Sequence, residues 1–251
     1  MLDHAGVVRR LAAAGFLHPE AEATELLASS RDEAAVEHAV ARRERGEPLA
    51  WITGRTAFAG LALAVDDGVY VPRPQTEALV EQAAARLPTG GRLVDLCCGS
   101  GAVAAGVAAR RDDVRVVGLD LDPAAVRCSV ANGVPVARAD IAVAPLAAGT
   151  ADVVTAVAPY VPTDGLGLLP ADVQRFEPRQ ALDGGPDGLS LVRLVVTAAA
   201  SLLRAGGWLL VEVGGDQDVR LAPHLIRQGF DQPEPWDDEE GDLRGLAARR
   251  R

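Results

Sequence analysis

The sequence contains no lysine, so all 25 of its basic residues are arginine, and 35 Asp and Glu residues outnumber them. The formal net charge is therefore −10. Broad, non-specific binding of nucleic acid needs an excess of positive charge against the phosphate backbone. We expect no direct nucleic-acid partner, although a small local basic patch is compatible with this balance.

Cysteine and long apolar runs are also scarce. The three cysteines are Cys97, Cys98 and Cys128, and they form neither a CxxC pair nor a zinc-binding spacing with histidine. We therefore expect no disulfide framework and no metal site. No stretch of about 18 apolar residues occurs, and charges interrupt residues 1–16, where a signal peptide would be apolar. The expected location is the cytoplasm, without a membrane partner.

Aromatic residues make up only 4% of the chain, whereas 49% of it is hydrophobic, nearly all Ala, Val and Leu. This composition is typical of a globular protein. The first 45 residues contain three stretches with apolar side chains at helical spacing. We expect a helical N-terminal domain at 1–47, acting as a packing cap, a lid or a substrate-docking module.

The segment 48–74 has a different pattern and is expected to link that domain to the rest of the chain. Apolar and small residues alternate over 61–65, a turn sequence Asp-Asp-Gly follows at 66–68, and a second apolar run occupies 69–71. Alternation on both sides of a turn sequence predicts a β-hairpin whose two strands flank that turn.

The remainder, 75–251, alternates between strand-like and helix-like segments. Strands are predicted at 92–96, 114–120, 134–140, 151–160 and 208–214, with one or two edge strands in 231–251. Helices are predicted at 75–87, 100–111, 123–133, 190–207 and 218–230. Such alternation is typical of βαβ units, so we expect an α/β fold with a mainly parallel, Rossmann-like sheet.

A glycine-containing turn follows the first strand of this alternation. Asp95 closes the strand, and Gly99 and Gly101 precede the helix. Glycine allows close approach of a ligand to the backbone, and a helix N-terminus presents unpaired N–H groups. The GxGxxG spacing of dinucleotide-binding enzymes fails, because Cys97 stands at its first glycine position. The turn suits a ligand with an amino-acid moiety better than a diphosphate, which disfavours an NAD-dependent dehydrogenase; an ordinary tight turn is the alternative.

Acidic residues end the next two strands. Asp120 lies about 20 residues after the glycine turn, the spacing at which a carboxylate accepts hydrogen bonds from ribose hydroxyls. Asp140 ends the third strand and is a candidate acceptor for an adenine amino group, or alternatively a solvated loop charge. A helix N-cap is the alternative for the acids at the second strand end, and Asp122 suits that role better. The neighbouring Leu121 and Ile141 are included in the predicted cofactor site.

Six stretches of the chain match motifs of one enzyme family. They are EPL and ITG at 47–54, F-x-GL at 58–61, VPRPQTE at 71–77, DLCCGSG at 95–101, FEPRQALDGG with DGL at 176–189, and AGGWLLVEVGGDQ at 205–217. On these motifs the region 46–230 resembles the protein-(glutamine-N5) methyltransferases that modify peptide-chain release factors. The CCGSG turn is similar to that of an actinobacterial-type branch of this family.

The resemblance implies a seven-stranded Rossmann-like core that binds S-adenosylmethionine and methylates the amide nitrogen of a glutamine side chain in a release factor. It also implies roles for individual residues. Residues Arg73, Thr76 and Glu77 would line the cofactor cleft, and Gly99 and Gly101 would approach the methionine part. In the same way, Asp120 would bind ribose and Asp140 would lie near adenine.

The chain departs from the family at the catalytic tetrad. Where the family has Asn-Pro-Pro-Tyr, this chain has Val157, Ala158, Pro159 and Tyr160. An amide nitrogen is a poor nucleophile, and the Asn oxygen with a backbone carbonyl would orient it. Val157 cannot accept a hydrogen bond, and losing one such partner costs about 1–3 kcal/mol, or roughly 10- to 150-fold in rate. Three interpretations stay open: slow glutamine methylation, methylation of another small molecule or protein group, and cofactor binding with little turnover.

Overall fold

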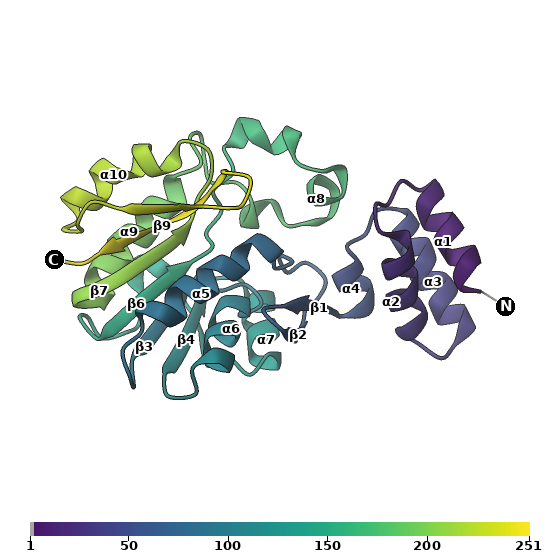
Figure 1. The fold of residues 1–251 in the computed structure, drawn as a ribbon, viewed down its shortest axis with the longest axis horizontal. Helices are drawn as coiled ribbons and strands as arrows, with labels where there is room; N and C mark the ends of the chain where they lie inside the picture. Colours follow the sequence, from purple (N-terminus) through teal and green to yellow (C-terminus); the bar gives the residue numbers. More distant parts are fainter. Residues whose placement is uncertain (1–2) are drawn as a thin grey trace.

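Three short helices begin the chain and pack on one another. The computed structural model describes residues 3–251, so Met1 and Leu2 lie outside the described residues. The helices are α1 (His4–Ala13), α2 (Pro19–Ala28) and α3 (Glu33–Glu44). Their facing side chains form a hydrophobic cluster of their own, and Figure 1 places this bundle to one side of the sheet. The sequence prediction of an N-terminal helical region is therefore confirmed.

A short helix and a β-hairpin connect this bundle to the rest of the chain. They are α4 (Leu49–Thr53), β1 (Arg55–Phe58) and β2 (Leu61–Ala64). The predicted hairpin exists, but its predicted pairing is wrong. β2 pairs antiparallel with β1, the strand before it in the sequence, and not with residues 69–71 after it. The two-residue turn Ala59-Gly60 joins them, and both of its φ angles are positive (52° and 80°). Residues 69–71 form no strand, and the Val69 carbonyl instead accepts a hydrogen bond from the Trp51 indole at 2.9 Å.

Seven strands form one sheet in the order β5–β4–β3–β6–β7–β9–β8. Their bounds are β3 (Arg92–Leu96), β4 (Arg115–Asp120), β5 (Val136–Arg138), β6 (Ala151–Ala156), β7 (Leu203–Glu212), β8 (Glu234–Asp237) and β9 (Leu243–Arg249). The strands β3 to β7 run parallel, and β9 is antiparallel to both β7 and β8. The predicted α/β, Rossmann-like, mainly parallel sheet is thus confirmed.

Two predicted boundaries in the C-terminal third need correction. The helix predicted over 190–207 ends at Leu202, and β7 begins at Leu203, paired with Ala151. The backbone is already extended at Leu203, which ends the helix there. Of the two predicted edge strands, only β8 is an edge, because β9 lies between β7 and β8.

Helices cover both faces of the sheet, because alternate strand residues point to opposite sides. The helices are α5 (Glu77–Arg86), α6 (Ala102–Arg110), α7 (Pro123–Ala131), α8 (Ala171–Phe176), α9 (Ser190–Leu202) and α10 (Gln217–Arg227). Val94 and Val154 pack on α9 and α10, whereas Leu93 and Val153 pack on α5, α6 and the hairpin (Figure 1). None of the helices within residues 3–251 is long and apolar enough to span a bilayer.

Four 3-10 turns complete the described elements, and most lie in the loops that follow the strands. They are η1 (Pro74–Thr76), η2 (Ile141–Val143), η3 (Thr163–Leu168) and η4 (Arg179–Ala181). Because β3 to β7 are parallel, the loops after their carboxyl ends gather at one edge of the sheet, where ligands bind in open α/β folds.

Candidate functional site

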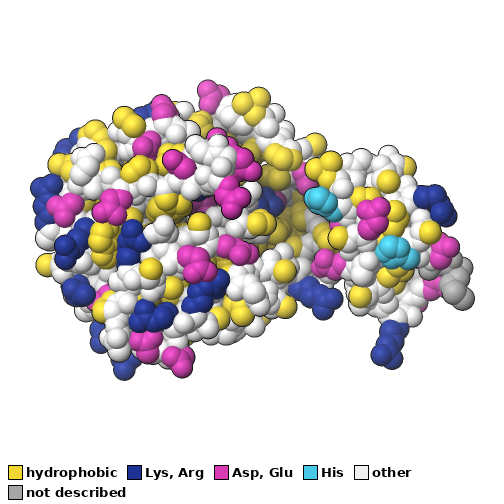
Figure 2. Space-filling model, viewed as in Figure 1, with side chains coloured by type: hydrophobic (Ala, Val, Ile, Leu, Met, Phe, Trp, Pro, Cys, Tyr) yellow, Lys and Arg dark blue, Asp and Glu magenta, His cyan; other side chains and the backbone are white. Residues whose placement is uncertain are grey.

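A cavity of about 1000 Å³ opens at this carboxyl edge. Its walls come from the linker before α5, the loops after β3, β4, β5 and β6, the end of β7, and the segment 169–182. In Figure 2 the surface is hollowed, with hydrophobic side chains around it, where the N-terminal bundle meets the core. All but two of the residues predicted for the site line this cavity: Arg73, Thr76, Asp95, Cys97, Gly99, Asp120, Leu121, Asp140, Ile141, Val157, Ala158, Pro159 and Tyr160.

The glycine turn after β3 forms one wall. Cys97, Gly99 and Gly101 all have positive φ angles, of 55°, 55° and 78°. No atom lies within 4 Å of where a Cβ on Gly99 would sit, so its backbone faces open space. Gly101 differs, because a Cβ there would come within 2.9 Å of the Ser129 hydroxyl on α7. Gly101 therefore permits close packing of α6 on α7 and lies outside the cavity lining.

Asp95 is a buried acid at the base of the cavity. Its Oδ1 accepts a hydrogen bond from the Thr155 hydroxyl at 2.8 Å, but its Oδ2 has no partner. Burial raises the pKa of this carboxyl to about 7, the Thr155 hydroxyl and the nearby Ala104 backbone N–H oppose the increase, and the charge of Asp120 adds to it. A buried polar atom without a partner is costly, so this oxygen is prepared to bind a donor in a ligand. A cationic amino group would satisfy it and stabilise its charged form.

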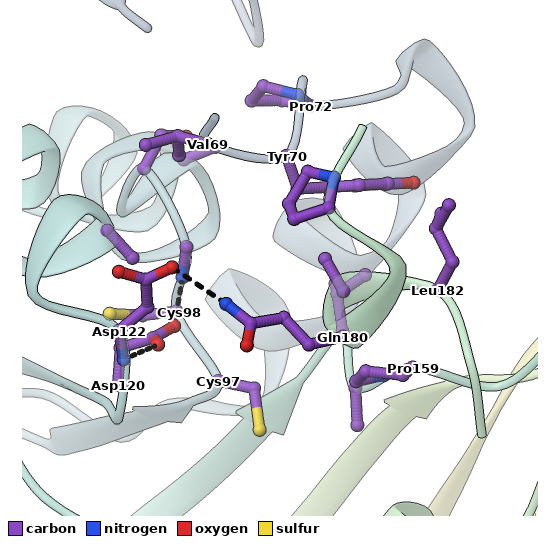
Figure 3. A pocket seen from close by; sticks show the side chains of 18 of the residues that line it. Val69, Tyr70, Pro72, Cys97, Cys98, Asp120, Asp122, Pro159, Gln180 and Leu182 are labelled. Atoms are coloured by element: carbon purple, nitrogen blue, oxygen red, sulfur yellow. Dashed lines mark hydrogen bonds between the residues drawn. The ribbon is translucent and has the colours of Figure 1, made fainter. Parts of the chain in front are cut away.

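Asp120 lies at the tip of β4 and connects that strand to the glycine turn. Its carboxylate accepts the Gly99 N–H at 2.8 Å and the Asp122 N–H at 2.9 Å, and each oxygen keeps a lone pair for a hydroxyl donor. Asp122 caps α7 through the Ala124 N–H at 2.8 Å, as predicted from the sequence. Figure 3 shows the side chain of Gln180 reaching across to this region, where its amide donates to Asp122 at 3.0 Å.

The loop after β5 forms the far end of the cavity. Asp140 is exposed and caps η2, so one oxygen of its carboxylate already accepts the Ala142 N–H at 2.9 Å. Ile141 is buried beneath it, and Leu121 is largely exposed at the rim. An apolar surface with one carboxylate beside it suits a flat, partly polar ring system.

Two ion-pair and hydroxyl clusters join motifs that are far apart in the sequence. Arg73 pairs with Glu177 across 104 positions. Glu212, at the end of β7, accepts from the Thr76 hydroxyl at 2.6 Å and from the Tyr160 hydroxyl at 2.9 Å. These contacts bring together four segments of the chain: 71–77, 176–179, 158–160 and 211–214.

Glu77 is the second predicted residue that does not line the cavity. Its carboxylate accepts the Ala59 N–H at 2.9 Å and so holds the hairpin turn against α5. The structure therefore places Glu77 in support of the fold around the site rather than in the cofactor cleft.

The tetrad 157–160 follows β6 and is held by the glycine-rich loop after η4. A Cβ on Gly184 would come within 2.7 Å of the Pro159 carbonyl oxygen, and one on Gly188 within 2.2 Å of the Tyr160 carbonyl oxygen. The Gln217 side-chain amide also donates to the Tyr160 carbonyl at 2.8 Å. Only glycine allows such close approach, which explains the GG and DGL motifs physically.

The cysteines of the glycine turn are unsuited to nucleophilic chemistry. Burial raises the pKa of both the Cys97 and the Cys98 thiols, with further contributions from nearby acids. The thiolate is the reactive form, so these side chains contribute shape rather than reactivity.

Sequence reasoning missed four residues of the site: Tyr70, Glu177, Gln180 and Glu212. Tyr70 and Gln180 project into the cavity in Figure 3, and the buried acid Glu212 lines it. Glu177 is buried and pairs with Arg73, which lines the cavity. A signal was available for Glu177 and Glu212, because both lie inside motifs of the resemblance and are acids within apolar or turn segments.

Comparison with known proteins agrees with this geometry. Residues 93–171 match the family described as "Methyltransferase domain". The release factor glutamine methyltransferase of Moorella thermoacetica is 39% identical over 237 residues, which cover 84% of this chain and 83% of that protein. The corresponding protein of Mycolicibacterium smegmatis is 40% identical over 204 residues, covering 78% of this chain and 72% of that protein. That of Geobacter sulfurreducens is 38% identical, covering 76% and 69%.

Solved structures support the fold alone. The ribosomal protein L11 methylase of Lactobacillus delbrueckii subsp. bulgaricus aligns with a TM-score of 0.54 at 14% identity, covering 74% of this chain and 84% of that chain. The T. thermophilus 16S rRNA N2 G1207 methyltransferase aligns with a TM-score of 0.52 at 21% identity, covering 78% and 44%. With the cavity, the open glycine turn and the unpartnered Asp95 oxygen, the matches to release factor glutamine methyltransferases lead to one assignment. The chain is an S-adenosylmethionine-dependent methyltransferase and belongs to the release factor glutamine methyltransferase family.

Proposed function

We propose that this protein methylates the side-chain amide nitrogen of a glutamine in a protein substrate, and that the substrate is a peptide-chain release factor. The observation that carries the proposal is the continuity of one cavity from Asp95 and Asp120 to the tetrad 157–160. A cofactor held at the first end and a side chain inserted at the second would meet inside it. The names of the relatives supply the substrate class.

The residues present fit S-adenosylmethionine. Asp95 would bind its ammonium group through the unpartnered Oδ2, Asp120 its ribose hydroxyls, and the surface of Leu121, Asp140 and Ile141 its adenine. Cys97 and Gly99 supply the backbone that faces the methionine part. When bound, the cofactor supplies a methyl group on a positively charged sulfur.

The substrate end of the cavity orients the amide less firmly than an Asn at position 157 would. Val157 lines the cavity and packs on the core cluster beneath it, so its side chain offers an apolar wall and no acceptor. We propose that Ala158 supplies a backbone carbonyl to one N–H of the amide, as the resemblance implies. If no other group took its place, the missing acceptor would reduce turnover by roughly 10- to 150-fold.

We further propose that 1–47 form a separate domain that helps to dock the protein substrate, with 48–74 as its linker and 75–251 as the methyltransferase domain. The helical bundle has its own hydrophobic cluster, and the linker lines the cavity through Val69, Tyr70 and Pro72. A substrate loop entering the cavity would therefore pass the bundle.

The proposed function is tested with purified protein, a release factor and isotopically labelled S-adenosylmethionine. Mass spectrometry of the digested release factor should find the label on one glutamine side chain. Val157→Asn should raise that rate by about tenfold or more, since it restores the acceptor. Absence of label on glutamine with both proteins, while the cofactor binds, would contradict the proposal.

The apolar wall at Val157 favours a second candidate, methylation of a group that needs no amide clamp, in a small molecule or another protein side chain. In that case Val157→Asn should lower the activity rather than raise it. A third outcome, binding of the cofactor with no labelled product from any substrate tested, would support a cofactor-binding protein with little turnover.

A further inference from the structure

Glu212 is a buried acid at the substrate end of the cavity, and neither the resemblance nor the cofactor site assigns it a role. It is 6% exposed and lines the cavity at the end of β7. Its two carboxylate oxygens each accept one hydroxyl, from Thr76 and from Tyr160. Since each carboxylate oxygen can accept two hydrogen bonds, one lone pair on each stays available.

Glu212 lies beside the position that lacks its acceptor. Strands β6 and β7 are parallel, and Ala156 pairs with Val211. One residue further along each strand, Val157 and Glu212 follow as neighbours, and residues paired in this way point to the same face of a sheet. The contacts agree, because Val157 packs on the cluster that includes α5, and Glu212 is bonded to Thr76 at the start of α5.

The carboxylate of Glu212 is not neutralised by a directly bonded arginine. Within residues 3–251 no arginine forms an ion pair with it, unlike Glu177, which Arg73 holds. Its two donors are neutral hydroxyls, which orient a carboxylate without removing its capacity to accept a proton. A buried acid held in this way, open to a cavity, is typical of a general base.

We propose that Glu212 supplies the acceptor that Val157 lacks: its carboxylate binds an N–H of the substrate amide and receives the proton released on methylation. This inference rests on the proposed function. In the reaction the amide nitrogen forms a bond to the methyl carbon, the carbon–sulfur bond breaks with its electron pair left on sulfur, and the N–H proton passes to the Glu212 carboxylate. The Thr76 and Tyr160 hydroxyls keep that carboxylate in position.

The proposal predicts how the rate depends on pH. Burial is the main cause that raises the pKa of Glu212, and the hydroxyls of Thr76 and Tyr160 oppose it. The charges of Arg244 on β9 and Arg73 in the linker also lower it. The partly buried phenols of Tyr160 and Tyr70 interact with the same carboxylate, and loss of solvent raises the pKa of both. Since only the ionised form accepts the amide proton, the rate should fall on acidification through a raised Glu212 pKa.

The test is Glu212→Gln, assayed on a release factor with saturating cofactor, beside Glu81→Gln as a control for an exposed acid on α5. We expect kcat to fall about 100-fold for the first variant, with loss of the acid limb of the pH–rate profile, and to change less than about twofold for the second. Cofactor affinity should be unchanged in both. A kcat and a pH profile like those of the wild type in Glu212→Gln would overturn the inference.

A purely structural role is separated by the double variant Val157→Asn/Glu212→Gln. If Asn at position 157 takes over the amide, Glu212→Gln should cost much less in that background than in the wild type. Equal losses in both backgrounds would contradict the inference. If Glu212→Gln fails to bind cofactor, the single variant Val157→Asn provides the test. A weaker fall of its rate at acidic pH than in the wild type supports the role of Glu212, and an unchanged fall refutes it. A wild-type protein that labels no glutamine would overturn the proposed function and this inference together, whereas an active wild type with an unaffected variant overturns the inference alone.

Discussion

Asp95 should couple cofactor binding to proton release. In the free protein its pKa is raised from 3.8 to about 7 because the carboxyl is completely buried, and its Oδ2 has no partner. Around neutral pH a large fraction of the protein therefore carries a protonated Asp95. A cationic ammonium group bound there favours the carboxylate, so binding should expel the proton.

The expected magnitude follows from linkage. Below a pKa of about 7, each pH unit should weaken binding by about tenfold, or ~1.4 kcal/mol, because the proton must leave first. Above that pH the affinity should level off. Asp95→Asn should bind more weakly at pH 8 and lose most of this slope.

The assay is calorimetry with S-adenosylhomocysteine from pH 5.5 to 8, in two buffers that differ in ionisation enthalpy. The wild type should show proton release below pH 7, and Asp95→Asn should show much less. Asp120→Asn serves as the comparison, because burial also raises the pKa of Asp120 in the same cavity. An affinity of the wild type that is flat over this range, or a slope retained in Asp95→Asn, would refute the reasoning.

The raised pKa of Asp95 also makes the free energy of unfolding depend on pH. The folded-state pKa of Asp95 is raised, so the folded protein binds the proton more tightly than the unfolded chain between pH 4 and 7. The contribution of this group to the free energy of unfolding is then largest at low pH and is lost as pH rises through about 7, up to ~4 kcal/mol in total. Urea unfolding of the wild type and Asp95→Asn should therefore converge toward low pH and diverge in favour of the variant toward pH 8.

Three further changes test other parts of the structure. Gly101→Ala adds a Cβ 2.9 Å from the Ser129 hydroxyl at a φ of 78°, so we expect a loss of about 2–3 kcal/mol in urea unfolding; a change below about 0.5 kcal/mol would show that α7 can move away. Arg73→Ala leaves the buried Glu177 without its cation and should lower the free energy of unfolding by about 2–3 kcal/mol. This loss is smaller than for a fully buried pair, because Arg73 is partly exposed, and it should shrink further in the presence of Glu177→Gln. Gln180→Leu removes the bond to the cap of α7 and should speed cofactor release about 3- to 10-fold in stopped-flow measurements, whereas an unchanged rate means that this bond does not restrain the cofactor.

The central strands and the glycine turn were predictable because their signals are local. Residues 93–96 are buried, three of the four are apolar, and the predicted strand 92–96 has those bounds in the structure. Asp120 and Asp122 were assigned from their position at a strand end and before a proline, and the cap at Asp122 is confirmed.

The pairing of the hairpin could not be predicted from local sequence patterns. The alternation over 61–65 predicts a strand but does not say which neighbour it pairs with. The Ala59-Gly60 turn decided the pairing, since two residues with positive φ close a hairpin on β1, and the Asp-Asp-Gly turn instead redirects the chain toward the cavity. The strand at Leu203 was missed for a similar reason, because its partner Ala151 lies more than 50 residues away.

The sequence by itself determined the class of fold, the position of the cofactor turn and the family. Periodicity, glycine spacing and motifs involve residues close together in the sequence, so they can be recognised without the tertiary structure. Only the tertiary structure decided which of the motif residues reach the cavity. It turned Glu77 toward the hairpin, joined Arg73 to Glu177, and set Glu212 between two hydroxyls beside Val157. Those contacts depend on strand order and on packing between segments up to 136 positions apart, and no local pattern carries that information.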